Sequence, residues 1–383
     1  MMGTGLGLPS RMCRIGRQSR GGRNRETAGR RASDEGRLPK IGKMTGFIAV
    51  IATGTAWAFL AGNRAAAEEP LAERTVAVLE AADPQFHDLI APDAKVQVLA
   101  EGFDWSEGPV WWPHGECLLF SDVPRNTVFQ WREGMGIDVF LKPSGYTGNR
   151  ARGGESGSNG LAVDALGRLI LCQHGDRRVA VWEDGCFRTL ADRYQGKPLN
   201  SPNDLAIRSN GDIYFTDPPY GMTPEAAQAD DALGFCGVYR IAKDGSLTLL
   251  TDRMTRPNGI GFSPDEKTLY VAQSDPANPI WMAFPVRDDG TLGDGKVFFD
   301  ASVWKESNLP GLPDGLKVDV AGNVFATGPG GVNVFRSDGR FVGRIRVSVP
   351  TANCAFGNDG SVLYITADMY LLRVQTKTKG LGF

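Results

Sequence analysis

Five acid or amide side chains occupy the same place in a phrase that the sequence repeats, each just ahead of a short apolar run. They are Glu107, Asn159, Asn203, Asn258 and Asp314. Hard divalent cations such as Ca²⁺ prefer carboxylate and amide oxygens, with water completing the shell. Two carboxylates balance a divalent charge, and the amides add oxygens without like-charge repulsion. If the fold brings these side chains together, they can hold one cation.

A single Asx-Gly pair has a simpler explanation as a turn, because Asn and Asp tolerate left-handed backbone and hydrogen-bond to their own main chain. Recurrence at one phase of five units favours a shared site instead, and a turn would not select the Glu of the first unit. A sixth copy of the phrase has Asn353 followed by Cys354.

The repeat itself predicts the elements that position these residues. The copies begin at residues 107, 159, 203, 258, 314 and 353. Each begins with a strand, a turn with Gly and a second strand, and we expect Gly167, Gly211 and Gly322 to adopt positive φ in three of these hairpins. A four-stranded blade with loops needs about 40–50 residues, so six copies predict an all-β fold, a six-bladed β-propeller over residues 96–383. Residues 85–103 are expected to add the outer strand that closes the ring.

The first 67 residues are expected to lie outside this domain. Residues 1–43 are rich in Arg and Gly without apolar periodicity, which predicts a disordered basic leader or a translation start later than Met1, at Met44. Lys40 and Lys43 precede an apolar run at residues 47–60 and the small residues 65–67, which is typical of a signal peptide cleaved near Ala67. The predicted location is therefore secreted or periplasmic. A membrane anchor is the alternative, although the run is short for a ~30 Å hydrocarbon core.

Residues 68–95 are expected to form a peripheral N-terminal segment, with a helical turn over residues 72–82. Residues 1–67 hold 12 Lys and Arg and 3 Asp and Glu, so residues 68–383 carry a net charge of −11. An acidic mature chain argues against a nucleic-acid partner. No stable membrane span is expected after cleavage, and the oligomeric state is not indicated.

Other chemistries find little support. The chain has three His and lacks the Gly-x-Ser-x-Gly motif, which argues against a Ser-His-Asp hydrolase. The cysteines lack a close CxxC pair, which argues against a thiolate zinc site. Cys172 and Cys186 stand on neighbouring strands, either as a disulfide or as separate thiols. Residues 142–158 and 218–235 interrupt the repeat, either as surface loops or as flaps over the substrate.

Aromatic and histidine side chains supply further candidates. Tyr220, Trp105 and Trp111 are candidates to line the channel, where a sugar-like substrate would pack on aromatic faces, or to be core. His174 ends a strand of the second unit, where it either faces the channel or makes a structural hydrogen bond. Neither a phosphate loop nor a dinucleotide fingerprint occurs.

Four motifs follow one another in the chain: SEGPVW at residues 106–111, NSPNDL at 200–205 with YFTDPPYG at 214–221, PNG at 257–259, and PDG at 313–315. With them the sequence resembles the family of senescence marker protein, gluconolactonase and luciferin-regenerating enzyme, over about residues 95–375. The resemblance implies a six-bladed propeller and a metal-dependent lactonase. Its substrate would be a lactone such as glucono-1,5-lactone, opened to the aldonic acid.

The resemblance also implies residue roles. Glu107, Asn258 and Asp314 match the metal ligands of the family, and Asn203 matches an amide that faces both metal and substrate. Asp314 also matches the proposed general base, for which a metal-bound hydroxide is the alternative. The predicted substrate-binding residues are Asn203, Asp204, Asn159, His174 and Tyr220. Ser201 stands where the mammalian branch has a substrate-contacting Arg, so the substrate contacts must differ.

Oxygen ligands favour Ca²⁺, while Zn²⁺, Mg²⁺ or Mn²⁺ are also compatible with a site completed by water. Two alternative functions remain. One is a non-catalytic propeller whose ion holds the blades together. The other is a paraoxonase-like or strictosidine-synthase-like activity. Strictosidine-type sites use a Glu base without this ligand set, so Asn258 and Asp314 argue against that variant.

Overall fold

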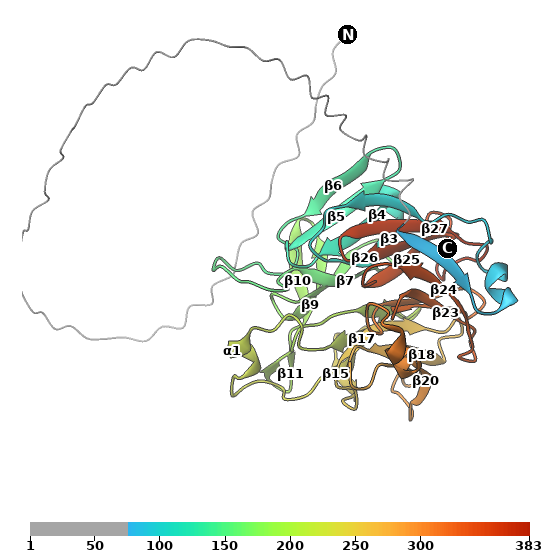
Figure 1. The fold of residues 1–383 in the computed structure, drawn as a ribbon. Helices are drawn as coiled ribbons and strands as arrows, with labels where there is room; N and C mark the ends of the chain where they lie inside the picture. The colour runs from blue at the N-terminus through green and yellow to red at the C-terminus, as the bar shows by residue number, and fades with distance from the viewer. Residues whose placement is uncertain (1–75) are drawn as a thin grey trace, which may run out of the picture. The chain divides into compact units, whose positions relative to one another are not determined.

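Six four- or five-stranded antiparallel sheets form the blades of a six-bladed β-propeller (Figure 1). The structure is a computed structural model and describes residues 76–383. The predicted leader, signal peptide and cleavage site near Ala67 lie outside the described residues. Within residues 76–383, no helix is both long enough and apolar enough to cross a membrane.

The first three blades follow one another along the chain, each running from an inner strand to an outer one. Blade 1 contains β3 (Ser106–Trp112), β4 (Cys117–Asp122), β5 (Thr127–Arg132) and β6 (Gly136–Leu141). Blade 2 contains β7 (Ser158–Val163), β8 (Leu169–Gln173), β9 (Arg178–Glu183) and β10 (Cys186–Ala191). Blade 3 contains β13 (Leu205–Ile207), β14 (Ile213–Asp217), β15 (Gly237–Ile241) and β16 (Leu247–Thr251).

The last three blades continue this order, and the final one needs a strand from the N-terminal side. Blade 4 contains β17 (Pro257–Phe262), β18 (Thr268–Gln273), β19 (Ile280–Pro285) and β20 (Lys296–Asp300). Blade 5 contains β21 (Leu316–Val318), β22 (Val324–Gly328), β23 (Gly331–Phe335) and β24 (Phe341–Val347). Blade 6 contains β25 (Asn353–Gly357), β26 (Val362–Ala367), β27 (Tyr370–Gln375) and, as its outer strand, β2 (Gln97–Glu101).

The pairing of β2 with β27 closes the ring between the two ends of the described chain. The strands are antiparallel, with Gln97 opposite Arg373 and Glu101 opposite Tyr370. This confirms the prediction that residues 85–103 supply the closing strand. Because the closing strand and its partner are far apart in sequence, the ring is complete only when both ends of the domain are in place.

The prediction of a helical turn over residues 72–82 is wrong in its described part. Ala77–Ala81 form β1, which pairs with β24 as a fifth strand of blade 5. The small and alternating side chains of this segment suit the exposed edge of a blade, where hydrogen bonds from β24 are available. Tertiary pairing therefore overrides the weak local preference for helix.

Short elements complete the described chain. They are the 3₁₀ turns η2 (Pro84–Asp88), η3 (Pro113–Gly115) and η4 (Ala301–Ser307), the helix α1 (Pro224–Ala227), and the small hairpin of β11 (Arg193–Tyr194) and β12 (Lys197–Pro198). Gly167, Gly211 and Gly322 have φ of +78°, +92° and +86°, which confirms the predicted hairpin turns.

Apolar side chains pack between neighbouring blades rather than in one central core. Phe120 and Trp131 of blade 1 share a cluster with Tyr364 of blade 6, and Val181 of blade 2 shares one with Phe215 of blade 3. The inner strands contact one another in the closed order β3, β7, β13, β17, β21 and β25, and β25 contacts β3.

Candidate metal and substrate site

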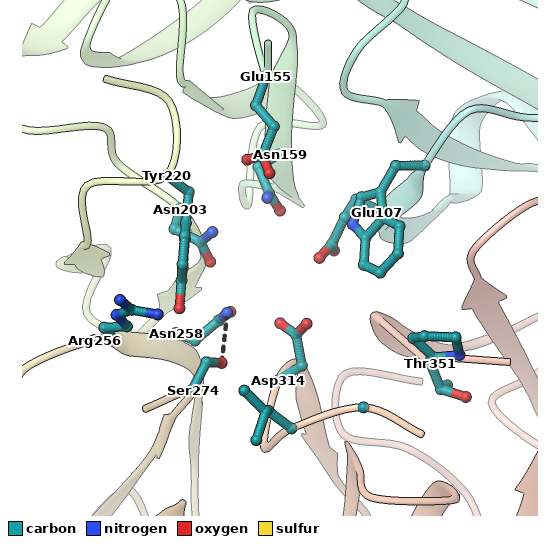
Figure 2. Close-up of a pocket in the computed structure, with 14 residues that line it drawn as sticks. Glu107, Glu155, Asn159, Asn203, Tyr220, Arg256, Asn258, Ser274, Asp314 and Thr351 are labelled. Carbon is teal, nitrogen blue, oxygen red and sulfur yellow. Dashed lines mark hydrogen bonds between the residues drawn. The ribbon is translucent and has the colours of Figure 1, made fainter. Parts of the chain in front are cut away.

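The five predicted oxygen donors line one cavity of about 360 Å³. Figure 2 shows Glu107, Asn159, Asn203, Asn258 and Asp314 arranged around its open centre. Four of the five side chains are at most 5% exposed, while Asp314 is partly exposed to the cavity. The structure therefore brings together residues from five different blades.

Register shifts help to aim three of these side chains. In blade 1 the pairing of β3 with β4 slips by one residue between Glu107 and Val110. The same shift follows Ser158 in β7 and Pro257 in β17, so Asn159 and Asn258 also lie in irregular pairs. A bulge of this kind re-aims a side chain and is frequent beside active sites.

Glycines that follow the donors let the inner strands approach one another. A Cβ on Gly108 would lie 2.0 Å from the carbonyl oxygen of Asn159, and one on Gly259 would lie 2.1 Å from that of Asp314. Of the glycines after donors, Gly108 has positive φ, whereas Gly160, Gly259 and Gly315 do not. The Asx-Gly pairs thus serve close packing between blades in most copies, rather than the left-handed turn that Asx-Gly usually signals.

Three oxygens that face the cavity lack a hydrogen-bond partner although they are buried. They are Oδ1 of Asn159, Oδ1 of Asn203 and Oδ1 of Asp314. A buried polar atom without a partner is costly and calls for an explanation such as a water or an ion. Unpartnered carboxylate and amide oxygens around one cavity are the donor set of an oxygen-ligated cation, so these residues fit the predicted metal.

Within the described residues, Glu107 and Asp314 form no ion pair with a cationic side chain. Burial raises the pKa of Glu107, and the nearby Asp204 raises it further. Burial likewise raises the pKa of Asp314 well above its usual range, with added repulsion from Glu107, Asp204 and Glu155. Among residues 76–383, no three His, Cys, Asp or Glu side chains form a metal-ligand cluster. The candidate ligands are therefore two acids and several Asn amides, and this set of oxygens suits Ca²⁺ better than Zn²⁺.

Neighbouring side chains hold two of the donors in place. Oε2 of Glu107 accepts a hydrogen bond from the backbone amide of Gly108 at 2.8 Å. Nδ2 of Asn258 donates to Oγ of Ser274 at 3.0 Å, and this hydroxyl in turn donates to the carbonyl of Pro313, the residue before Asp314. Ser274 therefore ties the Asn258 donor of blade 4 to the loop that carries Asp314.

The sixth copy of the repeat has a different task. Asn353 is buried, and its Nδ2 donates to Oδ2 of Asp204 at 3.2 Å. Its Oδ1 accepts from the backbone amide of Cys354 at 2.9 Å and from Nζ of Lys317 at 3.5 Å. Asp204 belongs to this buried network and does not line the cavity. A substrate in the cavity would therefore not contact Asp204 directly, because the cavity-lining donors lie between them.

The remaining predicted residues divide between the cavity wall and the layer behind it. Tyr220 and Trp105 line the cavity, whereas Trp111 stacks on Tyr364 at 6.0 Å and lies outside the lining. The hydroxyl of Tyr220 is buried and has no hydrogen-bond partner. His174 is fully buried behind Asn203, with its Nε2 3.5 Å from Nδ2 of that amide.

Sequence reasoning missed several residues of the wall, notably Glu155, Arg256, Ser274 and Thr351. Glu155 and Tyr220 lie on the two segments that interrupt the repeat, so both segments contribute to the cavity. Arg256 directly precedes the PNG motif, and that adjacency was the available signal. Ser274 and Thr351 carry no local pattern that distinguishes them from structural hydroxyls.

The cysteines take no part in the site. Cys117, Cys172, Cys236 and Cys354 are free thiols, so Cys172 does not form the disulfide with Cys186 that the sequence left open. Cys172 is buried between strands, and burial raises the pKa of its thiol well above the usual range. It is an inert core thiol.

Comparison with known proteins relates the whole propeller to one family. The family profile described as SMP-30/Gluconolactonase/LRE-like region matches residues 105–368. A gluconolactonase from Zymomonas mobilis is 37% identical over 343 residues, which cover 86% of this chain and 95% of that protein.

Solved structures agree with this match. A gluconolactonase from Xanthomonas campestris is 36% identical and superposes with a TM-score of 0.69, over 78% of this chain and 94% of that protein. A calcium-binding protein, regucalcin, from Agrobacterium tumefaciens is 21% identical with a TM-score of 0.58, over 74% of this chain and 94% of that protein. At that identity the second likeness shows the fold alone.

Proposed function

Because the chain belongs to the SMP-30/gluconolactonase/LRE-like family, we propose that it hydrolyses a sugar lactone with the help of a divalent cation. The enzyme class is that of a lactonase, a carboxylic ester hydrolase. The substrate we propose is an aldonolactone such as glucono-1,5-lactone, and the preferred cation is Ca²⁺. Glu107, Asn203, Asn258 and Asp314 would hold it, with Asn159 beside them.

One observation carries this proposal. Three buried oxygens of Asn159, Asn203 and Asp314 face a single cavity without hydrogen-bond partners, beside a second acid that has no counter-ion. A non-catalytic propeller with a structural ion would also need such ligands. It would not need the surrounding space of about 360 Å³, which has room for a six-membered ring.

The reaction places different demands on the individual residues. A divalent cation held by these acid and amide side chains would polarise the lactone carbonyl as a Lewis acid. Of the two acids among the donors, Asp314 is more exposed than Glu107, so it is the candidate to accept a proton from the attacking water. As the water oxygen bonds to the carbonyl carbon, the bond from that carbon to the ring oxygen breaks. The ring oxygen takes up a proton, and the product is the open hydroxy acid.

Side chains at the wall provide groups for the hydroxyls of the substrate. The unpartnered hydroxyl of Tyr220 can donate to or accept from one of them. Arg256 is exposed at the wall, and its guanidinium has no ion pair or hydrogen bond within the described chain. It is the free cation of the site, in a position to bind a hydroxyl or an anionic substituent. Tyr220 and Arg256 would take over the contact with substrate that an Arg makes in the mammalian branch, where this chain has Ser201.

The test is a pH-indicator hydrolysis assay on several sugar lactones, with chelator and then with Ca²⁺, Mg²⁺, Mn²⁺ or Zn²⁺ added back. Asp314→Asn and Glu107→Gln are expected to lower kcat/KM by about 10²–10⁴-fold, the usual contribution of a general base or more. Asp93→Asn, at an exposed acid outside the cavity, is the matched control. Circular dichroism checks that all three variants fold.

The outcomes separate the candidate functions. Full activity after chelation would remove the cation from the proposal. Cation binding without hydrolysis of any lactone or ester would favour the non-catalytic propeller. Hydrolysis of aryl esters in preference to sugar lactones would favour the paraoxonase-like alternative.

Export remains a separate proposal. We propose that the protein is secreted or periplasmic, because a positively flanked apolar run precedes the small residues at 65–67. Fractionation of cells that express the full chain, with N-terminal sequencing of the product, tests this. A cytoplasmic protein that starts at Met1 or Met44 would contradict it.

A further inference from the structure

We propose that His174, backed by Glu155, is a positioning residue that fixes the amide of Asn203 with its oxygen toward the cation. This inference rests on the proposed function, because it assigns a task toward the cation site. His174 belongs to neither the ring of donors nor the cavity wall. Its full burial directly behind a donor calls for an explanation of its own.

Contacts on both sides of the imidazole define the arrangement. Nε2 of His174 lies 3.5 Å from Nδ2 of Asn203. Nδ1 makes no hydrogen bond and lies 3.1 Å from Oε2 of Glu155, whose side chain is 38% exposed. The three groups therefore form a row from the cavity wall, through a buried ring, to a donor of the site.

The row determines which way the Asn203 amide faces. An amide nitrogen only donates, so Nε2 of His174 must accept and its proton must lie on Nδ1. A carboxylate only accepts, so Glu155 favours the same tautomer. With Nδ2 held by the ring, Oδ1 of Asn203 is left for the cavity, where it is the unpartnered atom. An amide turned the other way would aim two N–H groups at the cation.

Packing keeps the imidazole in place. A Cβ on Gly221 would lie 2.4 Å from Cβ of His174, so this glycine is needed for the close approach of the loop behind the ring. Arg152 donates to the carbonyls of Gly175 and Gly221 and so joins the Glu155 segment to the Tyr220 segment. The imidazole of His174 is therefore packed against the segment that carries Tyr220, which Arg152 links to the segment that carries Glu155.

Residues behind a metal ligand often set its orientation, and their loss weakens metal affinity by about 10–100-fold. We therefore expect His174→Phe, which fills the space but accepts no hydrogen bond, to weaken Ca²⁺ or Tb³⁺ binding to that extent. His174→Gln places an amide oxygen near the Nε2 position, so it should retain most of the affinity. Both substitutions are neutral, which separates orientation from charge.

The first experiment needs no cation. The chain has three His, and His87 and His114 lie outside the cavity wall. Nitrogen-15 NMR of the metal-free protein, assigned with His174→Gln, should show His174 as the neutral tautomer protonated on Nδ1. A signal protonated on Nε2 would overturn the proposal, whatever the variants do.

The second experiment is a double-mutant cycle read by Tb³⁺ luminescence titration and by calorimetry with Ca²⁺. Asn203→Asp offers an oxygen to the cation in either orientation. His174→Phe should therefore weaken binding about 10–100-fold in the wild-type chain and much less beside Asn203→Asp. Glu155→Gln is measured in the same way and removes one negative charge. Its control is Glu116→Gln, which removes one charge at an exposed acid on another surface.

Failure of this inference is distinguishable from failure of the proposed function. If the wild-type protein binds neither Tb³⁺ nor Ca²⁺, the cation site itself is wrong. If it binds them and His174→Phe binds equally tightly, only the positioning role is overturned. An equal loss in both backgrounds would assign His174 a general packing role instead.

Discussion

Tyr220 shows at the residue scale how one hydroxyl can report on substrate binding. Burial raises the pKa of its phenol far above the usual range, so the group stays protonated at any working pH. Its ring is held by the segment after β14, while its hydroxyl lies near Ser274 and Asn258 without forming a hydrogen bond of regular geometry. A lactone hydroxyl would satisfy it.

Tyr220→Phe is therefore expected to raise KM for sugar lactones by about 2–13-fold, the equivalent of one neutral hydrogen bond of about 0.5–1.5 kcal/mol. Affinity for the cation should not change, because the hydroxyl is not needed as a ligand. Steady-state kinetics and a Tb³⁺ titration measure the two quantities. An unchanged KM with every lactone tested would show that the hydroxyl does not contact substrate.

The residues of the site could be predicted from the sequence where they share one position in the repeat, and not elsewhere. Glu107, Asn159, Asn203, Asn258 and Asp314 share one phase, and that phase is what the structure places around the cavity. Glu155 and Arg256 have no such mark. Glu155 reaches the cavity from a segment without apolar alternation, and its position depends on contacts with His174 that no spacing encodes.

At the scale of elements, the glycines after the donors set the distance between inner strands. Gly259 is the clearest case, because a Cβ there would meet the backbone oxygen of Asp314, which cannot rotate away. The substitution would push β17 away from the chain that leads into β21. The donors Asn258 and Asp314 would then move apart.

Gly259→Ala is expected to destabilise the protein by about 1–3 kcal/mol, as overpacking usually does, and to weaken cation binding as well. Gly153→Ala is the matched control, because a Cβ at Gly153 meets nothing within 4 Å and its φ is not positive. Urea unfolding gives the stability and a Tb³⁺ titration gives the affinity. Equal behaviour of the two variants would show that the blades can relax around the extra methyl group.

The two segments that interrupt the repeat are joined by one side chain. Arg152 is partly buried against Tyr146, with its guanidinium 5.6 Å from the ring centroid, and donates to the carbonyls of Gly175 and Gly221. Hydrogen bonds from a charged group each contribute about 1.5–3 kcal/mol. The segments that carry Glu155 and Tyr220 are therefore held as a wall.

Arg152→Met keeps the length of the side chain and removes these bonds. We expect faster hydrogen exchange in residues 144–157 and 218–223, and a loss of kcat/KM of about tenfold because Glu155 and Tyr220 are less well placed. Arg150→Met, two residues away on an exposed position, should change neither. Protection that stays at the wild-type level would mean that other contacts hold the wall.

The elements also show where local sequence signals fail. The hairpins could be predicted because Gly167, Gly211 and Gly322 must adopt positive φ in short turns. β1 could not, because its strand conformation comes from pairing with β24, some 260 residues later in the chain. A strand that depends on a distant partner carries little local pattern of its own.

For the whole molecule, ring closure concentrates buried acids around one axis. Burial raises the pKa of Glu107 to about 8 and that of Asp217 to about 7, and it raises the pKa of Asp204 and Asp314. Asp217 does not line the cavity, whereas Glu107 and Asp314 do. A cation would therefore change the protonation of the second pair and leave Asp217 alone.

These raised pKa values determine how the stability of the protein and its affinity for a cation change with pH. A carboxyl with a raised pKa keeps its proton in the folded state at a pH where the unfolded chain has released it. The folded state then binds more protons, so the stability of the chelated protein should fall as pH rises from about 4.5 toward 8. Cation binding expels the protons of Glu107 and Asp314. The apparent affinity should thus rise about tenfold per pH unit for each proton released.

The measurement is the Ca²⁺-induced rise in Tm at fixed free Ca²⁺, between pH 5.5 and 8.5. We expect a larger rise at pH 8.5, because a cation that binds only the folded state stabilises it in proportion to the logarithm of its affinity. Glu107→Gln should flatten this dependence by removing one of the two protons, whereas Asp93→Asn should leave it unchanged. A Ca²⁺ effect that is equal across the range would mean that the acids around the axis are already ionised without a cation, with their charge balanced inside the ring.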